Sequence, residues 1–303
     1  MDFEIVTEGL QFPEGPIAMA DGSVVLVEIK RQTLTRVRPD GKQEVIAELG
    51  GGPNGAAVGP DGAVYVCNNG GFQWLEADGL TLPHGTALDY KTGSIQRVDL
   101  ASGKVTTLYD SCDGRALRGP NDIVFDSSGG FWFTDLGKSD GNIMHMGHVL
   151  YARPEGRTIK RAREGMVTPN GIGLSPDEKT VWVAETHTSR VWGFSVTGPG
   201  EIAVPANLFA QANVLGPLPG YQMLDSLAVE ADGKVCCATL VNGGITAFDP
   251  AGSTEHTAFP DPLITNICFG GDDMRTAWIT ASGTGKLLKC RWPRPGLKLA
   301  FNA

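Results

Sequence analysis

The chain has 303 residues, of which 41 are glycine and 19 are proline, and only 19% are charged. This length allows two average domains or one large all-β domain. The formal net charge of −9 argues against a nucleic-acid partner, because binding to a phosphate backbone draws most of its affinity from clustered Lys and Arg.

The first residues, MDFEIVTEGL, lack the charged and apolar regions of a secretory leader. No stretch approaches the roughly 20 apolar residues that are needed to span a bilayer. We therefore expect a cytoplasmic protein without a membrane partner. The six cysteines include no C-x-x-C pair, and four of them lie in apolar runs, which favours buried free thiols over disulfides.

Six segments along the chain share one pattern. Each has an alternating apolar strand, a turn rich in Asp and Gly, and a second strand dense in Val, Trp, Phe or Cys, which is typical of an antiparallel hairpin. The segments begin at Pro13, Pro53, Pro120, Pro169, Leu224 and Ile264. A second hairpin follows each one, from "LTRVRPDGKQEVI" in the first unit to "LLKCRWPRPGLKL" in the last.

The starts of these units lie 40 to 67 residues apart, close to the length of a propeller blade. Residues 1–303 are therefore predicted to form a single domain, an all-β, six-bladed β-propeller with four antiparallel strands per blade. We expect the last hairpin to end near Leu299 and the N-terminal strand, Phe3 to Val6, to complete its blade as the outer strand, which removes an exposed sheet edge.

One spacing is longer than the others because residues 70–93 form an insertion that carries Trp74 and His84. Long loops in compact folds are often functional lids, and a disordered decoration is the alternative.

One position of the repeat is polar in every unit. The residues at the head of each first strand are Glu14, Asn54, Asn121, Asn170, Asp225 and Thr265. First strands line the central channel of a propeller, so these side chains should form a ring. Turn chemistry explains the amides, but two carboxylates that converge in a channel require a cation or a proton. A set of oxygen ligands favours one Ca²⁺ ion, with Mg²⁺, Mn²⁺ and Zn²⁺ as alternatives.

Five ordered motifs resemble a known family: "FPEGP", "GPNDIVFD", "TPNGIGLSPDEKTVWVAET", "LDSLAVEADGKV" and "TNICFGGDDMRTAWITASGTGKLLKCRWPRPG". Over nearly its full length the chain is similar to the gluconolactonase and senescence-marker-protein (regucalcin-like) family. The resemblance implies a six-bladed propeller that hydrolyses sugar lactones with an axial divalent metal, usually calcium.

The resemblance also implies roles for individual residues. Its metal ligands fall on Glu14, Asn170 and Asp225. Asn121 and Asp122 would contact the substrate, and Asn121 would bind the metal as in some members. Arg118 would also bind the substrate, although it lies one residue further from the P-N-D motif than the Arg of many relatives.

A lactone is a cyclic ester, so its hydrolysis needs an activated water and stabilisation of charge on the carbonyl oxygen. A metal can polarise the carbonyl, and Asp225 is the candidate general base. Two alternatives stay open at this point. One is a phosphotriesterase of the diisopropyl-fluorophosphatase kind with Asp225 as nucleophile, and the other is a non-catalytic metal-binding propeller.

Overall fold

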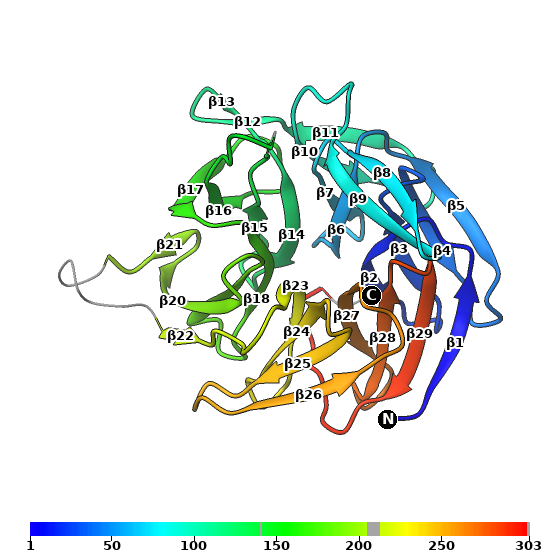
Figure 1. Ribbon diagram of the computed structural model, residues 1–303. Coiled ribbons are helices and arrows are strands. Elements are labelled where there is room, and N and C mark those ends of the chain that lie inside the picture. The colour runs from blue at the N-terminus through cyan, green and yellow to red at the C-terminus, as the bar shows by residue number, and fades with distance from the viewer. Residues whose placement is uncertain (140, 205–212, 302–303) are drawn as a thin grey trace.

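The computed structural model describes residues 1–139, 141–204 and 213–301. Within these residues every regular element is a β-strand, and six antiparallel sheets surround a central axis (Figure 1). The six-bladed propeller predicted from the repeat is confirmed. The structure shows no helix of the length and apolarity needed to cross a membrane in its described part. The cytoplasmic location stays a prediction.

The blades follow one another along the chain. Blade 1 contains β2 (Pro13–Ala18), β3 (Val24–Glu28), β4 (Thr33–Val37) and β5 (Gln43–Glu48). Blade 2 contains β6 (Pro53–Val58), β7 (Val64–Asn68), β10 (Ser94–Val98) and β11 (Val105–Tyr109). Blade 3 contains β14 (Pro120–Phe125), β15 (Phe131–Asp135), β16 (Gly147–Ala152) and β17 (Ile159–Met166). A short pair, β12 (Ser111–Cys112) and β13 (Arg115–Ala116), connects blades 2 and 3.

The second half of the ring repeats this pattern with one addition. Blade 4 contains β18 (Pro169–Leu174), β19 (Thr180–Glu185), β20 (Arg190–Gly198), β21 (Glu201–Ile202) and an extra strand, β22 (Asn213–Leu215). Blade 5 contains β23 (Met223–Val229), β24 (Val235–Leu240), β25 (Gly244–Phe248) and β26 (Thr254–Ala258). Blade 6 contains β27 (Ile264–Gly270), β28 (Thr276–Ala281), β29 (Lys286–Arg291) and β1 (Phe3–Glu8).

The tight turns inside the blades contain the Asp and Gly residues from which the hairpins were predicted. In the turn between β2 and β3, Gly22 has a φ of +80°, and the Asp21 carboxylate accepts a hydrogen bond from the Ser23 backbone N–H at 3.0 Å. Glycine adopts this backbone conformation without strain, and an Asp side chain satisfies a backbone donor two residues on. These turns fix the register of the paired strands.

Blade 6 closes the ring as expected. β1 pairs antiparallel with β29, and Phe3 lies opposite Cys290. The prediction of a final hairpin ending near Leu299 is wrong, because after β29 the chain leaves the blade. There the Leu297 backbone N–H donates to the Val229 carbonyl at 2.8 Å. Leu297 and Phe301 then line an apolar cavity of about 110 Å³ on the axis. Since β1 already pairs with β29, this C-terminal tail is free to contact the axis instead.

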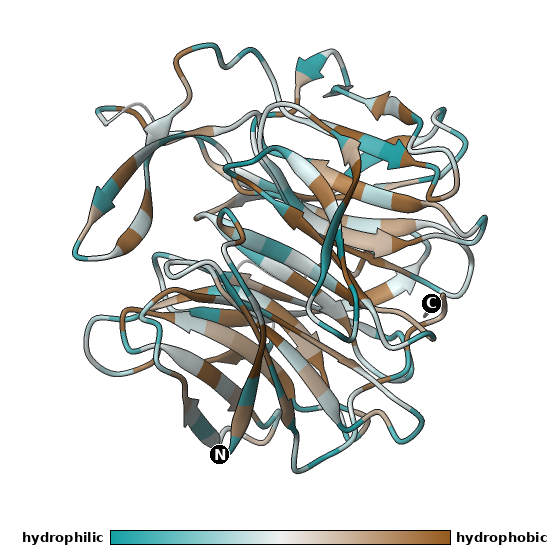
Figure 2. Cartoon of the chain, turned by 90° about the vertical axis from the view of Figure 1, so that its right-hand side faces the viewer, coloured by the Kyte–Doolittle hydropathy of each residue, from teal (hydrophilic) through white to brown (hydrophobic). Residues whose placement is uncertain are grey.

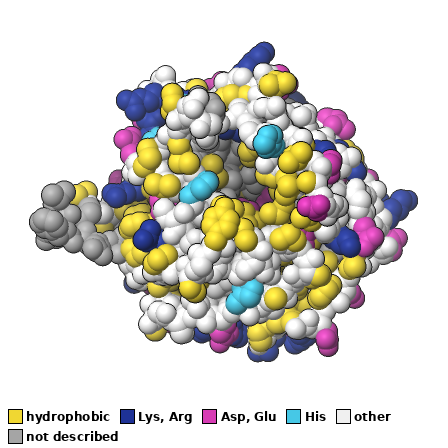
Figure 3. All heavy atoms as spheres, in the orientation of Figure 1, with side chains coloured by type: hydrophobic (Ala, Val, Ile, Leu, Met, Phe, Trp, Pro, Cys, Tyr) yellow, Lys and Arg dark blue, Asp and Glu magenta, His cyan; other side chains and the backbone are white. Residues whose placement is uncertain are grey.

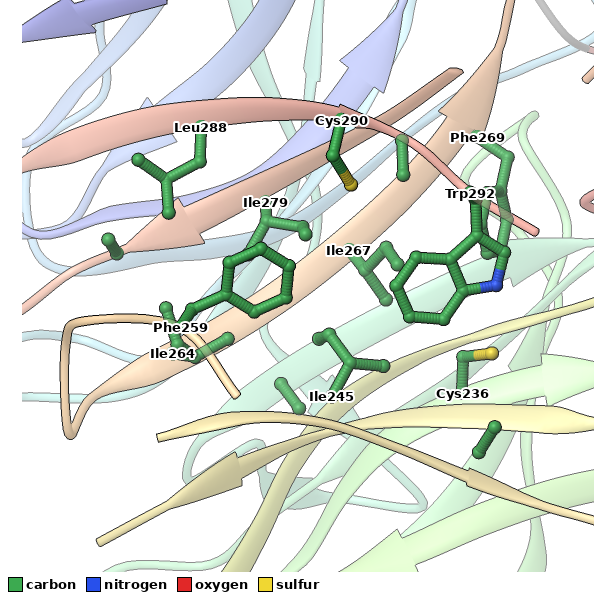
Figure 4. Close-up of a cluster of buried hydrophobic side chains, with 14 residues drawn as sticks. Cys236, Ile245, Phe259, Ile264, Ile267, Phe269, Ile279, Leu288, Cys290 and Trp292 are labelled. Atoms are coloured by element: carbon green, nitrogen blue, oxygen red, sulfur yellow. The ribbon is translucent and has the colours of Figure 1, made fainter. Parts of the chain in front are cut away.

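Apolar side chains pack between neighbouring blades. Figure 4 shows the cluster between blades 5 and 6. Ile245 of β25, Ile264 of β27 and Trp292, which follows β29, are buried together in it. Bands of hydrophobic residues cross the stacked sheets, and many connecting loops are hydrophilic (Figure 2). All six cysteines are free thiols, as predicted, and five of them are buried. The interiors between blades need no disulfide because they bury a large apolar area.

The insertion at residues 70–93 is ordered. It forms a two-stranded hairpin of β8 (Phe72–Ala77) and β9 (Leu80–Thr86), outside the four strands of blade 2. This hairpin lies on the face of the ring that is turned toward the viewer in Figure 1.

Candidate metal and active site

The first strands of the blades place the predicted ring residues together. Pro13, Pro53, Pro120 and Pro169 each lie opposite the last residue of the second strand of their blade. The next residue is therefore equivalent in each blade. Adjacent first strands contact each other around the whole ring, from β2 and β6 through to β27 and β2. The head residues thus surround the axis at one end, which we call the mouth.

Local irregularities direct these side chains toward the axis. The pairing register shifts directly after the head residue, for example between Glu14 and Ile17, and such bulges commonly re-aim a side chain. The following residue is glycine in three blades. A Cβ on Gly15 would lie 2.6 Å from the Asn54 carbonyl oxygen, and one on Gly171 would lie 2.6 Å from the Leu227 backbone nitrogen. Glycine is required there because neighbouring first strands approach so closely.

Blade 6 departs from the predicted ring. The Thr265 hydroxyl hydrogen-bonds within its own blade, to the Thr280 and Ser282 hydroxyls at 2.8 and 2.6 Å. Asn266, one residue further on, donates its side-chain N–H to Glu14 Oε2 at 2.7 Å. The inclusion of Thr265 in the ring is therefore wrong. The repeat alignment could not show this, because both residues are polar and local pairing decides which one turns inward.

Three carboxylates lie near the axis without an ion-pair partner. Burial, then the charge of Asp225 and more weakly that of Asp122, raises the pKa of Glu14 well above its usual range. Burial raises the pKa of Asp122 to about 7 and that of Asp225 to about 7, and the charge of Asp122 adds to the shift of Asp225. Among the described residues, no Lys or Arg forms an ion pair with any of the three. Burial therefore disfavours the ionised form of these carboxylates, and no basic side chain offsets this cost.

The amide members of the ring strengthen the case for a cation. The Asn121 Oδ1 atom is fully buried and has no hydrogen-bond donor. The Asn170 side-chain N–H donates to Thr186 Oγ1 at 3.1 Å, and its Oδ1 has only a long contact of 3.5 Å from Ser226 Oγ. An orphan buried acceptor beside carboxylates is costly unless a positive group binds it. The donor set therefore fits a hard divalent cation.

The four predicted ligands differ in exposure. Glu14, Asn121 and Asn170 are at most 5% exposed, whereas Asp225 is only partly buried. Asp225 is thus the member of the set with access to a group that enters from the mouth. The part of the chain described by the structure contains no cluster of three or more His, Cys, Asp or Glu side chains with metal-site geometry. The proposed set differs from such a cluster because it combines two carboxylates with two amides.

The predicted substrate residues lie in different surroundings. Asp122 lies one position deeper than Asn121, and its carboxylate accepts hydrogen bonds from the Ile123 and Ile172 backbone N–H groups at 2.9 and 3.3 Å. Asp122 therefore bridges blades 3 and 4. The Arg118 backbone N–H donates to Asp135 Oδ2 at 2.7 Å. Arg118 also lines a pocket of about 400 Å³ with Arg115, Arg161, His145 and His148. A contact between Arg118 and substrate stays a prediction.

Two polar residues near the site were not predicted from the sequence. Asn266 contacts Glu14, as described above. Asn69 follows β7; its Oδ1 accepts the Gly71 backbone N–H at 2.8 Å, while its Nδ2 is buried without a partner. No spacing or charge pattern marks Asn69, because its importance depends on the fold of the insertion that follows it.

Other buried carboxylates near the mouth have structural roles. Glu28 accepts the Gln11 N–H at 2.7 Å, and Glu185 accepts the Val167 N–H at 2.8 Å. Asp135 accepts the N–H groups of Arg118 and Gly119, both at 2.7 Å. Each thus holds the loop that enters the first strand of its own blade.

Comparison with known proteins identifies the family of this chain. The model of the SMP-30/Gluconolactonase/LRE-like region matches residues 12–283. A gluconolactonase of Zymomonas mobilis is 26% identical over 312 residues, covering 92% of this chain and 78% of the relative. Lactonase drp35 of Staphylococcus saprophyticus is 28% identical over 252 residues, covering 82% of this chain and 70% of the relative.

Solved structures share the fold. A gluconolactonase of Xanthomonas campestris superposes with a TM-score of 0.74 at 21% identity, covering 96% of this chain and 89% of that one. A calcium-binding regucalcin of Agrobacterium tumefaciens superposes with a TM-score of 0.74 at 17% identity, covering 98% of both chains. Because the family model spans most of the sequence, from the strand that carries Glu14 to the loop after β28 in blade 6, this chain belongs to the SMP-30/gluconolactonase/LRE-like family.

Proposed function

We propose that this protein is a divalent-metal-dependent hydrolase that opens a lactone, either a sugar (aldono-)lactone or a related cyclic ester. The observation that carries the proposal is the buried oxygen set on the axis, in which Asn121 Oδ1 lacks a donor and the nearby carboxylates lack a basic partner. Relatives named gluconolactonase and lactonase supply the reaction class. A calcium-binding structural neighbour favours Ca²⁺ as the ion.

Glu14, Asn121, Asn170 and Asp225 would hold the cation. Two carboxylates neutralise a divalent ion, and the two amides add neutral oxygens. Bound there, such an ion would supply Lewis acidity toward the lactone carbonyl and acidify a coordinated water.

The residues of the chain account for the remaining steps. Asp225, partly exposed at the mouth, is positioned to accept a proton from the attacking water. Because the basicity of Asp225 would be lower with a cation bound, the site suits an activated ester better than an amide. Asn121 and Asp122 would orient the substrate from blade 3, with Arg118 as a further contact. Burial raises the pKa of Asp225 to about 7, and a side-chain hydrogen bond from Asn170 partly offsets this shift by favouring the ionised form.

The test is a pH-stat assay of protein stripped with EDTA, on a panel of γ- and δ-lactones. Ca²⁺, Mg²⁺, Mn²⁺ or Zn²⁺ is added back in separate arms. We expect no activity without metal and the highest activity with Ca²⁺. The variants Asp225→Asn and Glu14→Gln should each lose at least 100-fold in kcat/KM, the range typical of a lost acid–base group. Full metal-dependent activity in either variant would contradict these assignments.

Asp249→Asn is the matched control, since it makes the same carboxylate-to-amide change in blade 5. Asp249 forms a surface ion pair with Lys234 at 3.3 Å, in the turn between β25 and β26. Its variant should keep the wild-type rate. A single turnover in labelled water also separates the chemistry: incorporation of solvent oxygen into the first product indicates attack by water. An unlabelled first product would indicate an Asp225 nucleophile.

A further inference from the structure

The β8–β9 hairpin forms one wall of the mouth. It starts from blade 2, yet it contacts three other blades. The Thr86 hydroxyl donates to the Ser139 carbonyl of blade 3 at 3.0 Å, the Thr81 backbone N–H donates to the Gly283 carbonyl of blade 6 at 2.9 Å, and Glu76 forms an ion pair with Lys30 of blade 1. These partners all lie in loops at the end of the ring that carries the head residues. The hairpin is therefore fixed along the rim.

Aromatic side chains connect this wall to the predicted cation site. The Trp74 ring lies 5.0 Å from that of Phe12, and Phe12 is two residues before Glu14. Phe72 packs against Trp74 with ring centroids 6.0 Å apart. At the base of the hairpin, Lys138 donates to the Gly71 carbonyl at 3.1 Å and lies 4.5 Å from the Phe72 ring centre. Lys138 is thereby occupied in holding the hairpin.

Exposed apolar side chains continue around the mouth. They come from the insertion, from the loop after β15, from the loop before β23 and from the loop after β24: Leu75 (45% exposed), Leu88 (91%), Met144 (45%), Met146 (44%), Tyr221 (79%) and Val241 (43%). In Figure 3, hydrophobic side chains surround the hollow at the centre of this face. We call these side chains the apolar rim; exposed apolar side chains gathered around a hollow often mark a binding surface.

The apolar members of this rim bear on the class of lactone that can bind. The hydroxyl groups of a sugar lactone would lose water against the side chains of Trp74 and Met144, which offer few hydrogen-bond partners, and this loss is unfavourable. An alkyl or aryl substituent would instead gain free energy because it would bury its apolar surface there. The oxygens of the proposed cation site lie at the axis, and only the ester group of the substrate has to reach them.

We propose that the substrate is a lactone with an apolar substituent, whose ring ester enters the axial site while the substituent packs against Trp74 and the apolar rim. This inference rests on the proposed function and specifies its substrate class. It assigns the insertion at residues 70–93 a role in specificity.

The test compares kcat/KM of the metal-loaded protein for three δ-lactones: δ-decalactone, unsubstituted δ-valerolactone and glucono-δ-lactone, each corrected for spontaneous hydrolysis. We expect δ-decalactone to exceed each of the other two at least tenfold. Trp74→Ala should reduce the ratio of kcat/KM for δ-decalactone to kcat/KM for δ-valerolactone at least fivefold. Trp74→Phe, which preserves an aromatic wall and the hairpin, should retain most of the preference.

Met144→Ser and Val45→Ser form a matched pair, because both side chains are about equally exposed, at 45% and 44%, but Val45 lies on the outer strand β5. Met144→Ser should lower the ratio of kcat/KM for δ-decalactone to kcat/KM for δ-valerolactone, and Val45→Ser should leave this ratio unchanged. Equal or better turnover of glucono-δ-lactone would overturn the apolar-substrate inference and leave the lactonase proposal standing. Failure to open any lactone with any of the four cations would reject both.

Discussion

At the scale of single residues, the chemistry of the site depends on oxygens that the protein itself leaves unpaired. Most buried polar atoms in a folded protein have a partner, and Asn121 Oδ1, which has none and lies among the axial oxygens, is where we propose that a cation binds. Glu14 is different, because it already accepts hydrogen bonds from the Gly15 N–H at 2.5 Å and from Asn266. Its side chain is therefore oriented before a cation binds.

Asn121→Leu tests this interpretation directly. The substitution removes the orphan oxygen and keeps a side chain of similar size. We expect Ca²⁺ affinity, measured by isothermal titration calorimetry, to fall at least tenfold, which corresponds to about 1.4 kcal/mol. Without metal, the variant should be as stable as the wild type or more stable, because no buried acceptor is left unsatisfied.

Asn121→Asp is the companion variant, since it retains an oxygen and adds a negative charge. It should bind Ca²⁺ at least as tightly as the wild type and should be less stable in EDTA. Unchanged Ca²⁺ affinity in Asn121→Leu would mean that Asn121 is not a ligand.

At the scale of elements, the C-terminal tail is held by a buried acid far from the mouth. Glu230 is fully buried, and its carboxylate accepts hydrogen bonds from the Trp292 indole at 2.6 Å and from the Arg294 guanidinium at 3.1 Å. Trp292 and Arg294 follow directly after β29. Glu230 thus turns the chain from blade 6 toward the axis, where Leu297 joins the edge of blade 5.

We expect Arg294→Met to destabilise the protein by about 3 kcal/mol, because removal of one partner leaves a buried charge uncompensated. The free energy of unfolding in urea measures this effect. Arg291→Met is the control, since the Arg291–Asp273 ion pair is exposed and surface pairs contribute at most about 1 kcal/mol. Equal effects of the two substitutions would show that Glu230 does not anchor the tail.

At the scale of the whole molecule, the predicted cation links distant parts of the ring. Its ligands come from blades 1, 3, 4 and 5, while β1 and β29 close the circle between the two ends of the chain. Removal of the ion should therefore affect the stability of the entire propeller. The three axial carboxylates also make that stability depend on pH.

Folding raises the pKa values of Glu14, Asp122 and Asp225 above those of the unfolded chain, so the metal-free folded state holds protons that the unfolded state releases. This contribution to stability is present at low pH and is lost as pH rises through about 7. In EDTA, we expect the free energy of unfolding to fall by about 1–3 kcal/mol between pH 6 and pH 8 from these groups.

Saturating Ca²⁺ should remove this loss, because the ion favours the ionised carboxylates, and the stabilisation by Ca²⁺ should therefore grow with pH. Urea unfolding at both pH values, in EDTA and in CaCl₂, measures the effect. The double variant Asp122→Asn/Asp225→Asn should show a smaller pH dependence in EDTA. A wild-type stability that rises with pH in EDTA would contradict the assignment.

The sequence by itself determined the repeat, the number of blades, the closing strand and the axial positions of Glu14, Asn121, Asn170 and Asp225. Hairpin periodicity and turn residues are local, and a ring places equivalent positions of a repeat at equivalent places in space. The family motifs agreed, because they lie on the same first strands.

Only the tertiary structure decided the rest. It showed that Asn266, and not Thr265, turns toward Glu14, because the side-chain direction at a bulge depends on strand pairing. It directed the C-terminal tail to the axis, since β1 already occupied the outer edge of β29. It also brought Trp74 to Phe12 and placed the insertion along the mouth. These contacts join segments distant in sequence, and no local pattern of residues encodes which loops meet across the face of a ring.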